Sequence, residues 1–446
     1  MEKLSKKYGF FTAVSMVVGI VIGSGVFKSA GSVLSASGGN LKVSILAWAI
    51  GGGIMIVSAY AFSLVAVTLK ENNGIADFIE DAFGEKVAYI VAWFMNFIYF
   101  PTLTGILAWL AGSVTSSILG YEDTVNGLSV WLFGLGYFIL TYLLNLLTPV
   151  IAGKWQVSAT VIKLIPVFLI AIVGLIIGTV NGNISTNFSV IAENSGAGSL
   201  VKAVAVTAFA YEGWILALSI APELKNAKRN LPLALVLGSL IVAVAYLLFY
   251  IGLSGVLSNE EAIQLSGSLD TSVLAAKRLF GAVLGSTVNV LILVSVLGTL
   301  NGLIMGGSRG MYNIALKGRG PKPVWFLKVS KYNVPSYSLV ISMVFSLLWG
   351  LLWFGNFNGL FNGFMDVSIL PIVFLYGSYI LVYFNIMINM KNLNVINRFI
   401  VPVLSTGGAL YLIYGSFISD PLMFIYFSLI VLVIISFGVI TYSKRA

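Results

Sequence analysis

"VVGIVIGSGVF", residues Val17–Phe27, places three glycines and one serine within seven residues of the first apolar stretch. Glycine in a helix interior costs about 1 kcal/mol relative to alanine. Backbone that leaves the helix at membrane depth is tolerated only where it is buried in protein or lines a cavity. The stretch therefore predicts an apolar helix that is broken between Gly19 and Gly25, beside a cavity.

The composition is that of an integral membrane protein. Of the 446 residues, 59% are hydrophobic and 9% are charged, whereas a soluble domain carries about 25% charged residues. Apolar runs of about 20 residues recur along the whole chain, which favours spanning helices over barrel strands. The first run is too long for a cleavable signal peptide, and none is expected.

The sequence contains no cysteine and no histidine. Without cysteine we expect no disulfide-linked ancillary subunit, and without histidine the commonest proton shuttle and metal ligand is missing. No connection between apolar runs is large enough for a soluble enzyme core. We therefore expect no enzyme, no metal, no cofactor and no nucleic-acid partner, and the net charge of +9 reports membrane topology.

The hydropathy pattern predicts an all-α protein with twelve transmembrane helices. Their predicted bounds are 10–36, 43–69, 86–119, 128–148, 155–181, 200–223, 231–257, 281–316, 336–354, 364–389, 397–419 and 421–442. With both termini on one side, that side receives 19 of the 25 basic residues, and the other receives Lys28 and four more. The excess predicts cytoplasmic termini in a multi-pass protein of the cell membrane.

A second interruption lies in the sixth span, where Ala210, Tyr211, Glu212 and Gly213 follow Phe209. A glutamate in mid-membrane costs roughly 2.5–3.5 kcal/mol. Paired glycine-interrupted helices at matching positions of two halves indicate a transporter site at the midplane. The interval of five spans predicts inverted repeats over residues 1–190 and 191–391, with a scaffold pair of helices over 392–446.

Two broken helices supply the groups that a free α-amino acid needs. The amides of Gly23, Ser24 and Gly25 lie at the start of a new helix, where the dipole favours a carboxylate. Bare carbonyls near Val21 and Phe209 suit an ammonium group. The alternative is that these glycines only pack against neighbouring helices.

Several motifs together resemble the amino acid–polyamine–organocation superfamily, with its LeuT-like fold. These are "GIVIGSGVF", "FAYEGW", "ELKNAKRNLPLA" (223–234), "NGLIMGGSRGMYNIALKGRGPK" (301–322) and "NNGIADFIEDAFG" (72–84). The chain is most similar to the L-type amino-acid exchangers and to bacterial serine/threonine and alanine–serine–cysteine exchangers. It departs from the usual pattern at Ala227 and Ile75, where proline and glycine are common.

The resemblance implies roles for individual residues. The carboxylate would be held by the amides of Gly23, Ser24 and Gly25. The ammonium would be held by the carbonyls of Val21, Phe209 and Glu212, and Tyr211 belongs to the same substrate-binding segment. The ring of Phe209 would close over the substrate as a gate.

Lys163 lies about 12 Å into the fifth span at 1.5 Å per residue. It can reach the interface by extending its side chain, with Pro166 bending the helix. Sodium-driven relatives of this fold hold Na⁺ between spans 1, 5 and 8. By that resemblance, Lys163 supplies a tethered cation near Gly19 and makes transport independent of sodium.

Glu212 has four open interpretations: it favours cationic substrates, pairs with a fixed cation such as Lys163, carries a proton, or faces a water-filled vestibule. Minor candidates for lining a cavity are Asn96, Tyr99, Thr299, Asn301 and Asp366. For each of these, an interhelical hydrogen bond is the stronger expectation.

The sequence therefore predicts a sodium-independent antiporter that exchanges small neutral L-amino acids (Ala, Ser, Thr, Cys) by alternating access. A proton-coupled symporter and a cationic amino-acid or polyamine exchanger are the alternatives on the same fold. A receptor would use the same pocket without turnover. The expected partners are free L-amino acids and the lipid bilayer, and the expected assembly is a monomer or weak homodimer.

Overall fold

The computed structural model describes residues 9–68, 75–190, 197–216, 218, 224–360 and 367–442. Within these ranges the chain is helical and has no β-strand. In a bilayer each helix bonds its backbone polar groups inside its own segment, so this is the expected class. The helices form two compact units. Unit 1 comprises Met1–Ala88, Val167–Ser266 and Ile372–Ser419, and unit 2 comprises Tyr89–Pro166, Gly267–Pro371 and Asp420–Ala446.

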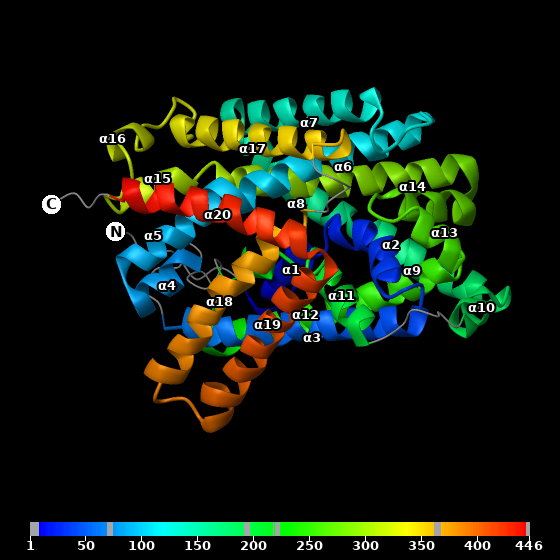
Figure 1. Ribbon diagram of the computed structural model, residues 1–446, viewed down its shortest axis with the longest axis horizontal. Coiled ribbons are helices and arrows are strands. Elements are labelled where there is room, and N and C mark those ends of the chain that lie inside the picture. The colour runs from blue at the N-terminus through cyan, green and yellow to red at the C-terminus, as the bar shows by residue number, and fades with distance from the viewer. Residues whose placement is uncertain are drawn as a thin grey trace. The chain divides into compact units, whose positions relative to one another are not determined.

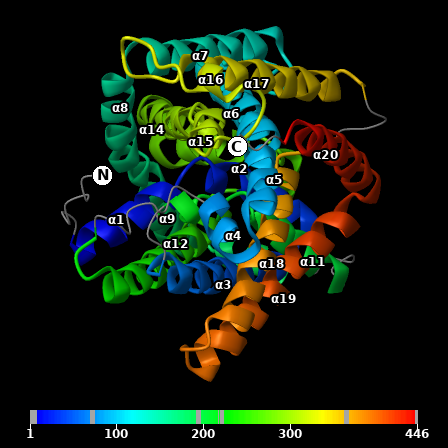
Figure 2. The ribbon, with the colours of Figure 1, turned by 90° about the vertical axis from the view of Figure 1, so that its left-hand side faces the viewer.

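Unit 1 contains the first and the sixth apolar stretches. Its helices are α1 (Phe10–Val21), α2 (Gly25–Ala36), α3 (Leu41–Ala66), α4 (Ile75–Phe83), most of α9 (Leu164–Val180), α10 (Asn183–Ser189), α11 (Ala197–Thr207), α12 (Ala227–Ser254), α13 (Asn259–Gln264), most of α18 (Leu370–Asn389), the π-helix η3 (Ile396–Ile400) and α19 (Val401–Ser419). α3 packs along α12 and α11, α1 lies beside α12, and α2 contacts α11 and α13 (Figures 1 and 2).

The core of unit 1 is rich in aromatic side chains. The Trp48 ring of α3 meets the rings of Tyr211, Tyr246 and Tyr250 at centroid distances of 5.6, 5.8 and 5.7 Å. All four side chains are buried. Edge-on and tilted pairs of this kind add to the energy gained from burial alone, so this cluster joins α3 and α12 to the segment after α11.

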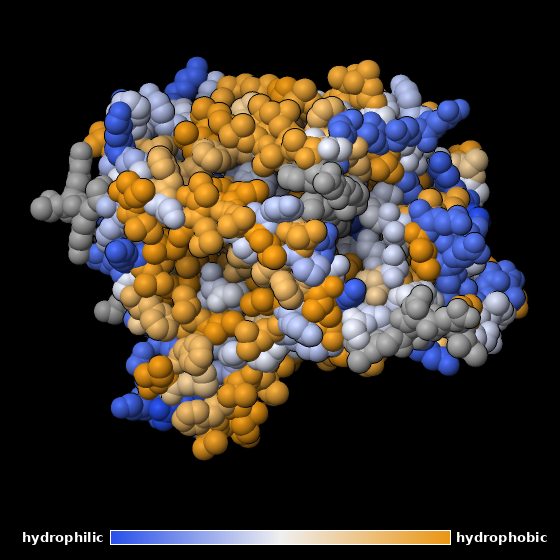
Figure 3. Space-filling model, in the orientation of Figure 1, coloured by the Kyte–Doolittle hydropathy of each residue, from blue (hydrophilic) through white to orange (hydrophobic). Residues whose placement is uncertain are grey.

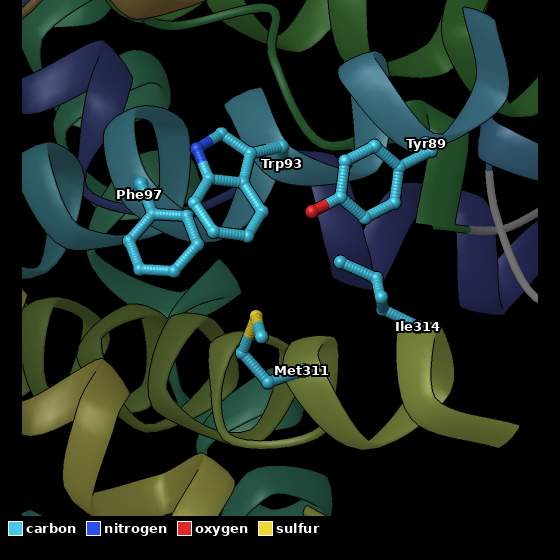
Figure 4. Packing of buried hydrophobic residues seen from close by; sticks show 5 residues of the cluster. All are labelled: Tyr89, Trp93, Phe97, Met311 and Ile314. Atoms are coloured by element: carbon cyan, nitrogen blue, oxygen red, sulfur yellow. The ribbon is translucent and has the colours of Figure 1, made fainter. Parts of the chain in front are cut away.

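Unit 2 is built around α6. Its helices are most of α5 (Glu85–Phe94), the π-helix η1 (Met95–Tyr99), α6 (Phe100–Leu119), α7 (Leu128–Leu147), α8 (Pro149–Ile162), α14 (Asp270–Gly307), α15 (Gly310–Leu316), α16 (Pro323–Phe326), α17 (Ser336–Phe357) and α20 (Pro421–Thr441). α6 packs against α7, α14 and α17. Figure 4 shows a buried cluster in this unit, formed by Tyr89, Trp93, Phe97, Met311 and Ile314.

The described residues contain most of the twelve predicted spans. Ten helices among the described residues are long and apolar enough to cross a membrane, and the bent pair α1–α2 raises the number to eleven. The predicted span 200–223 begins as α11, but most of its end lies outside the described residues. The predicted 86–119 agrees with the observed Glu85–Leu119. α14 begins at Asp270, before the eighth predicted span, which starts at residue 281. Its helical backbone is interrupted at Gly281 (φ 76°), the first residue of that predicted span.

Large apolar side chains cover much of the surface. Figure 3 shows broad hydrophobic areas on the face that it presents. Exposed leucine and valine side chains of α7, α17 and α20 include Leu132, Leu348 and Val433. A soluble monomer rarely exposes apolar areas of this size. These side chains therefore fit a lipid environment, and the chain is a multi-pass membrane protein.

Candidate functional site

The first apolar stretch is interrupted where its glycines cluster. α1 ends at Val21, α2 begins at Gly25, and the two helices are bent by 55°. Val21, Gly23, Ser24 and Gly25 are buried. The first intrahelical amide bond of α2 runs from Lys28 to the Ser24 carbonyl, at 3.2 Å. Backbone amides at the start of a helix precede its regular bonding pattern, and such amides commonly bind anions.

The sixth apolar stretch also leaves the helical path. α11 ends at Thr207, and residues 208–213 form turns in which the Ala210 and Tyr211 amides both donate to the Thr207 carbonyl. Gly213 has φ +105°, a left-handed conformation that side-chain-bearing residues rarely adopt. The glycine next to Glu212 is therefore required by the turn.

The two interruptions meet inside unit 1. A Cβ atom added to Gly25 would lie 2.6 Å from the Ala210 Cα and 2.8 Å from the Phe209 carbonyl oxygen. A Cβ atom added to Gly213 would lie 3.6 Å from the Ile20 carbonyl oxygen. The start of α2 therefore packs directly against residues 209–210 of the second break, and Gly213 lies near the end of α1.

Two tyrosines hold the breaks in place. The Tyr246 hydroxyl of α12 donates to the Val21 carbonyl at 3.0 Å, and the Tyr211 hydroxyl donates to the Trp48 carbonyl at 2.9 Å. A carbonyl oxygen has two lone pairs, so Val21 can still accept from an ammonium. The Tyr211 hydroxyl faces α3, and the substrate contact predicted for Tyr211 stays a prediction. Sequence reasoning missed Tyr246, because nothing in an apolar helix marks which tyrosine faces a break.

Lys28, which the charge count groups with the basic residues of the outer side, has a side chain that is only 3% exposed. Its Nζ lies over the ring of Phe209, 5.0 Å from the centroid. The close approach of α2 to residues 209–210 brings the two side chains together. A positive charge count cannot distinguish such a lysine from one at the membrane surface.

Glu212 is partly buried in unit 1, and its Oε2 atom is shielded from solvent. It lies within electrostatic range of the Tyr376 and Tyr383 hydroxyls of α18. The neighbouring Trp214 ring packs against Phe62 at 5.3 Å. The carboxylate thus lies beside polar groups of a helix that sequence reasoning did not connect with it.

Lys163 lies between α8 and α9, at a turn that interrupts the fifth span. It is 3% exposed. Ala159, one turn earlier, packs on Gly298 of α14, where an added Cβ would approach to 2.7 Å. Residues four apart share a helix face, so Lys163 lies on the α14-facing side of α8. Its predicted partner Gly19 is buried in unit 1, and that contact stays a prediction.

Among the minor candidates, Asn301 joins helices. Its Nδ2 donates to the Ala152 carbonyl and to Gln156 Oε1, and its Oδ1 accepts from Asn145. The Asn96 amide donates to the Ala92 carbonyl. The sequence favoured interhelical hydrogen bonds for these residues; the bonds of Asn301 are of that kind, whereas the Asn96 bond lies within its own span. Further polar candidates are Tyr99, which is buried, Thr299, which bonds within α14, and Asp366, which lies outside the described residues.

Comparison with known proteins now identifies the chain. Residues 8–440 match the family described as amino acid permease. The chain belongs to the amino acid permease family. This permease is 32% identical over 312 residues to the serine/threonine exchanger SteT of Bacillus subtilis, covering 70% of this chain and 68% of that protein.

Other relatives of the permease are exchangers and transporters of animals. The human cystine/glutamate transporter is 24% identical, covering 74% of this chain and 65% of that protein. The rat b(0,+)-type amino acid transporter 1 is 27% identical, covering 76% of this chain and 68% of that protein. These relatives confirm the predicted resemblance to the L-type transporters and show a transporter of amino acids rather than an enzyme.

A solved structure shows the fold of the permease. An inward-facing structure of Mhp1 matches 99% of this chain and 93% of the other with a TM-score of 0.59 at 12% identity. At that identity the likeness concerns the fold alone, and it confirms the predicted LeuT-like class.

Proposed function

We propose that this permease exchanges small neutral L-amino acids (Ala, Ser, Thr, Cys) across the cell membrane without sodium. The observation that carries the proposal is the contact between Gly25 and residues 209–210. In this proposal the amides of Gly23, Ser24 and Gly25 bind the carboxylate, and the carbonyls of Val21 and Phe209 bind the ammonium. These groups bind the part common to all amino acids. Similarity to a serine/threonine exchanger supports the small neutral class.

Sodium independence rests on Lys163. Its ammonium supplies a fixed positive charge in the fifth span, on the side of α8 that faces α14. Ala159 of α8 packs against Gly298 of α14. Continuing this pairing by one turn along both helices sets Lys163 at the level of Ser295. Ser295 has a buried hydroxyl without a partner among the described residues. A tethered cation at this level replaces a bound ion.

The remaining features of the proposal concern assembly and topology. Both termini lie in the cytoplasm, and the repeats span residues 1–190 and 191–391 with residues 392–446 outside them. Phe209 gates the site during alternating access. The permease acts as a monomer or weak homodimer without a disulfide-linked subunit, since its sequence has no cysteine.

Uptake of radiolabelled L-serine or L-alanine into proteoliposomes tests the proposal. Empty vesicles are compared with vesicles preloaded with unlabelled amino acids, in sodium-free buffer. We expect uptake only into preloaded vesicles and the same initial rate when sodium is added. Equal uptake into empty vesicles, or a steep dependence on sodium, contradicts the proposal.

Glu212 favours a second candidate function, proton-coupled symport. A shielded carboxylate beside two phenols can take up and release a proton if water reaches it in one state of the cycle. Uptake into empty vesicles that rises with an inward proton gradient, and loses this dependence in Glu212→Gln, supports symport. If the variant instead keeps its turnover and loses selectivity against lysine or polyamines, Glu212 recognises the substrate side chain.

A further inference from the structure

Lys28 occupies a place that transport of a neutral amino acid does not by itself explain. It lies in the first turn of α2, three residues after Gly25, on the helix that offers its amides to the substrate carboxylate. Its side chain is almost wholly buried. Removing an ammonium from water is unfavourable unless nearby groups compensate for the lost hydration. The groups that contact the Lys28 ammonium must therefore compensate for its lost hydration.

The Phe209 ring is one of those groups. The Nζ–centroid distance of 5.0 Å is inside the range of about 6 Å in which a ring face attracts a cation. Exclusion of water strengthens this attraction. The backbone keeps the pair together, because Gly25 lies directly against Phe209 and Ala210. One helix thus carries both the carboxylate-binding amides and a cation on the gate.

We propose that Lys28 is a positioning residue that holds the Phe209 ring through its charge. This inference rests on the proposed function, in which Phe209 is the gate over the substrate. When α2 moves with a bound carboxylate, the ammonium carries the ring with it. Binding of the common part of the substrate and closure of the gate are then linked through Lys28.

Fluorinated phenylalanines at position 209 test the inference with little change of shape. One, two and three fluorines progressively remove the negative ring face that attracts a cation. We expect the KM for L-serine exchange to rise in steps, reaching about tenfold, which corresponds to about 1.4 kcal/mol. The same series at Phe78, buried against Phe62, serves as the control and leaves the KM unchanged.

Lys28 variants complete the test. In Lys28→Met the fluorine series has no further effect on the KM, and Lys28→Arg restores the steps. A KM that is insensitive to fluorine with Lys28 present, or effects that add fully in the Lys28→Met background, overturns the inference. Exchange by the unmodified permease is measured alongside, so absence of exchange counts against the proposed function alone.

A spectroscopic measurement decides the inference even without transport. The ¹⁹F resonance of 4-fluorophenylalanine at position 209 is recorded in the purified permease. We expect it to shift in Lys28→Met and to stay in place in Lys42→Met, which alters an exposed lysine. An unchanged resonance in Lys28→Met contradicts the contact.

A separate observation concerns the connection 317–337 in unit 2, called the basic loop. It has five basic residues and no acidic one. Lys322, Lys328 and Lys331 are exposed and lie over the rings of Trp325, Tyr337 and Tyr332, at 4.4, 6.0 and 5.0 Å. Exposed apolar side chains alternate with these lysines along the loop, namely Val324, Leu327 and Val329.

We infer that the basic loop binds the head groups of anionic phospholipids. Tryptophan and tyrosine prefer the level of the head groups, and lysines near the surface are attracted to anionic lipid. The basic loop therefore presents positive charges together with aromatic and apolar side chains. The occupant is thus a negatively charged lipid surface.

Native mass spectrometry of the permease from mixed phosphatidylglycerol and phosphatidylcholine micelles tests this inference. We expect retained phosphatidylglycerol to fall at least about threefold when Lys322, Lys328 and Lys331 are all changed to Gln. Lys225, Lys228 and Lys391, which are exposed elsewhere, are changed to Gln as the matched control and keep the lipid. Equal retention by the two triple variants overturns the inference.

Discussion

At the scale of single residues, the hydrogen atom that serves as the side chain of Gly25 allows the two breaks to meet. The nearest atoms belong to the backbone of residues 209–210, which cannot move aside as a flexible side chain can. Any added atom would therefore push the start of α2 away from residues 209–210.

The Gly25→Ala variant tests this geometry. We expect exchange of L-serine to fall at least about tenfold, equivalent to about 1.4 kcal/mol, because the added Cβ would overlap Ala210 Cα. Gly53→Ala in α3 is the control, since nothing lies within 4 Å of the added atom there. Exchange rates and melting temperatures are measured for both. Normal exchange by Gly25→Ala contradicts the site.

Removing the Tyr246 hydroxyl tests whether its hydrogen bond to the Val21 carbonyl holds the break between α1 and α2 in place. The Tyr246→Phe variant loses one buried hydrogen bond, a change worth about 1 kcal/mol. We expect weaker L-serine binding by several-fold, because the Val21 carbonyl is no longer fixed. Equilibrium binding of labelled serine to the purified variant measures the effect, and an unchanged affinity removes Tyr246 from the site.

The sequence predicted the residues of the breaks better than their partners. Clustered glycines and a mid-membrane glutamate are unusual in a spanning helix, so Gly25 and Glu212 could be recognised. Tyr246 and Lys28 are ordinary residues in their local sequence. Only the packing of α12 and α2 against the breaks gives them a role, and local sequence does not encode that packing.

At the scale of helices, the contact between α8 and α14 positions Lys163. Ala159 fits against Gly298, and Asn301 bonds to Ala152 and Gln156. The hydropathy pattern gave the extent of these spans. It did not show that the fifth span begins at Pro149 or that it turns at Lys163, because a polar start is indistinguishable from a loop.

Gly298→Val tests this packing. The added side chain would collide with Ala159, and overpacking of this kind costs about 1–3 kcal/mol. We expect a lower melting temperature together with a loss of exchange, as Lys163 moves with α8. Gly302→Ala is the control, because the atoms nearest to its added Cβ belong to the flexible end of Gln156. A fully active Gly298→Val variant contradicts the positioning of Lys163 by α14.

At the scale of the whole molecule, the compact units do not coincide with the predicted repeats. Each unit combines helices from both halves of the chain. Sequence position alone separates residues 1–190 from 191–391, whereas contacts in space group α1, α3 and α12 together. The sequence could therefore predict the order and class of the helices, but not which of them form one compact body.

The absence of cysteine makes topology directly testable. A single cysteine at Glu122, an exposed residue after the third span, should react with an impermeant maleimide added to intact cells. A single cysteine at Lys391, an exposed residue after the tenth span, should react only after permeabilisation. The reverse pattern places the termini outside the cytoplasm.

The central claim is that the two breaks bind the carboxylate and the ammonium of one amino acid. The most direct test is competition against labelled L-serine in exchange by proteoliposomes. We expect L-alanine to compete, and ethanolamine and 3-hydroxypropanoate to fail at a hundredfold excess, because the first lacks the carboxylate and the second the ammonium. Effective competition by either single-charge analogue contradicts the claim.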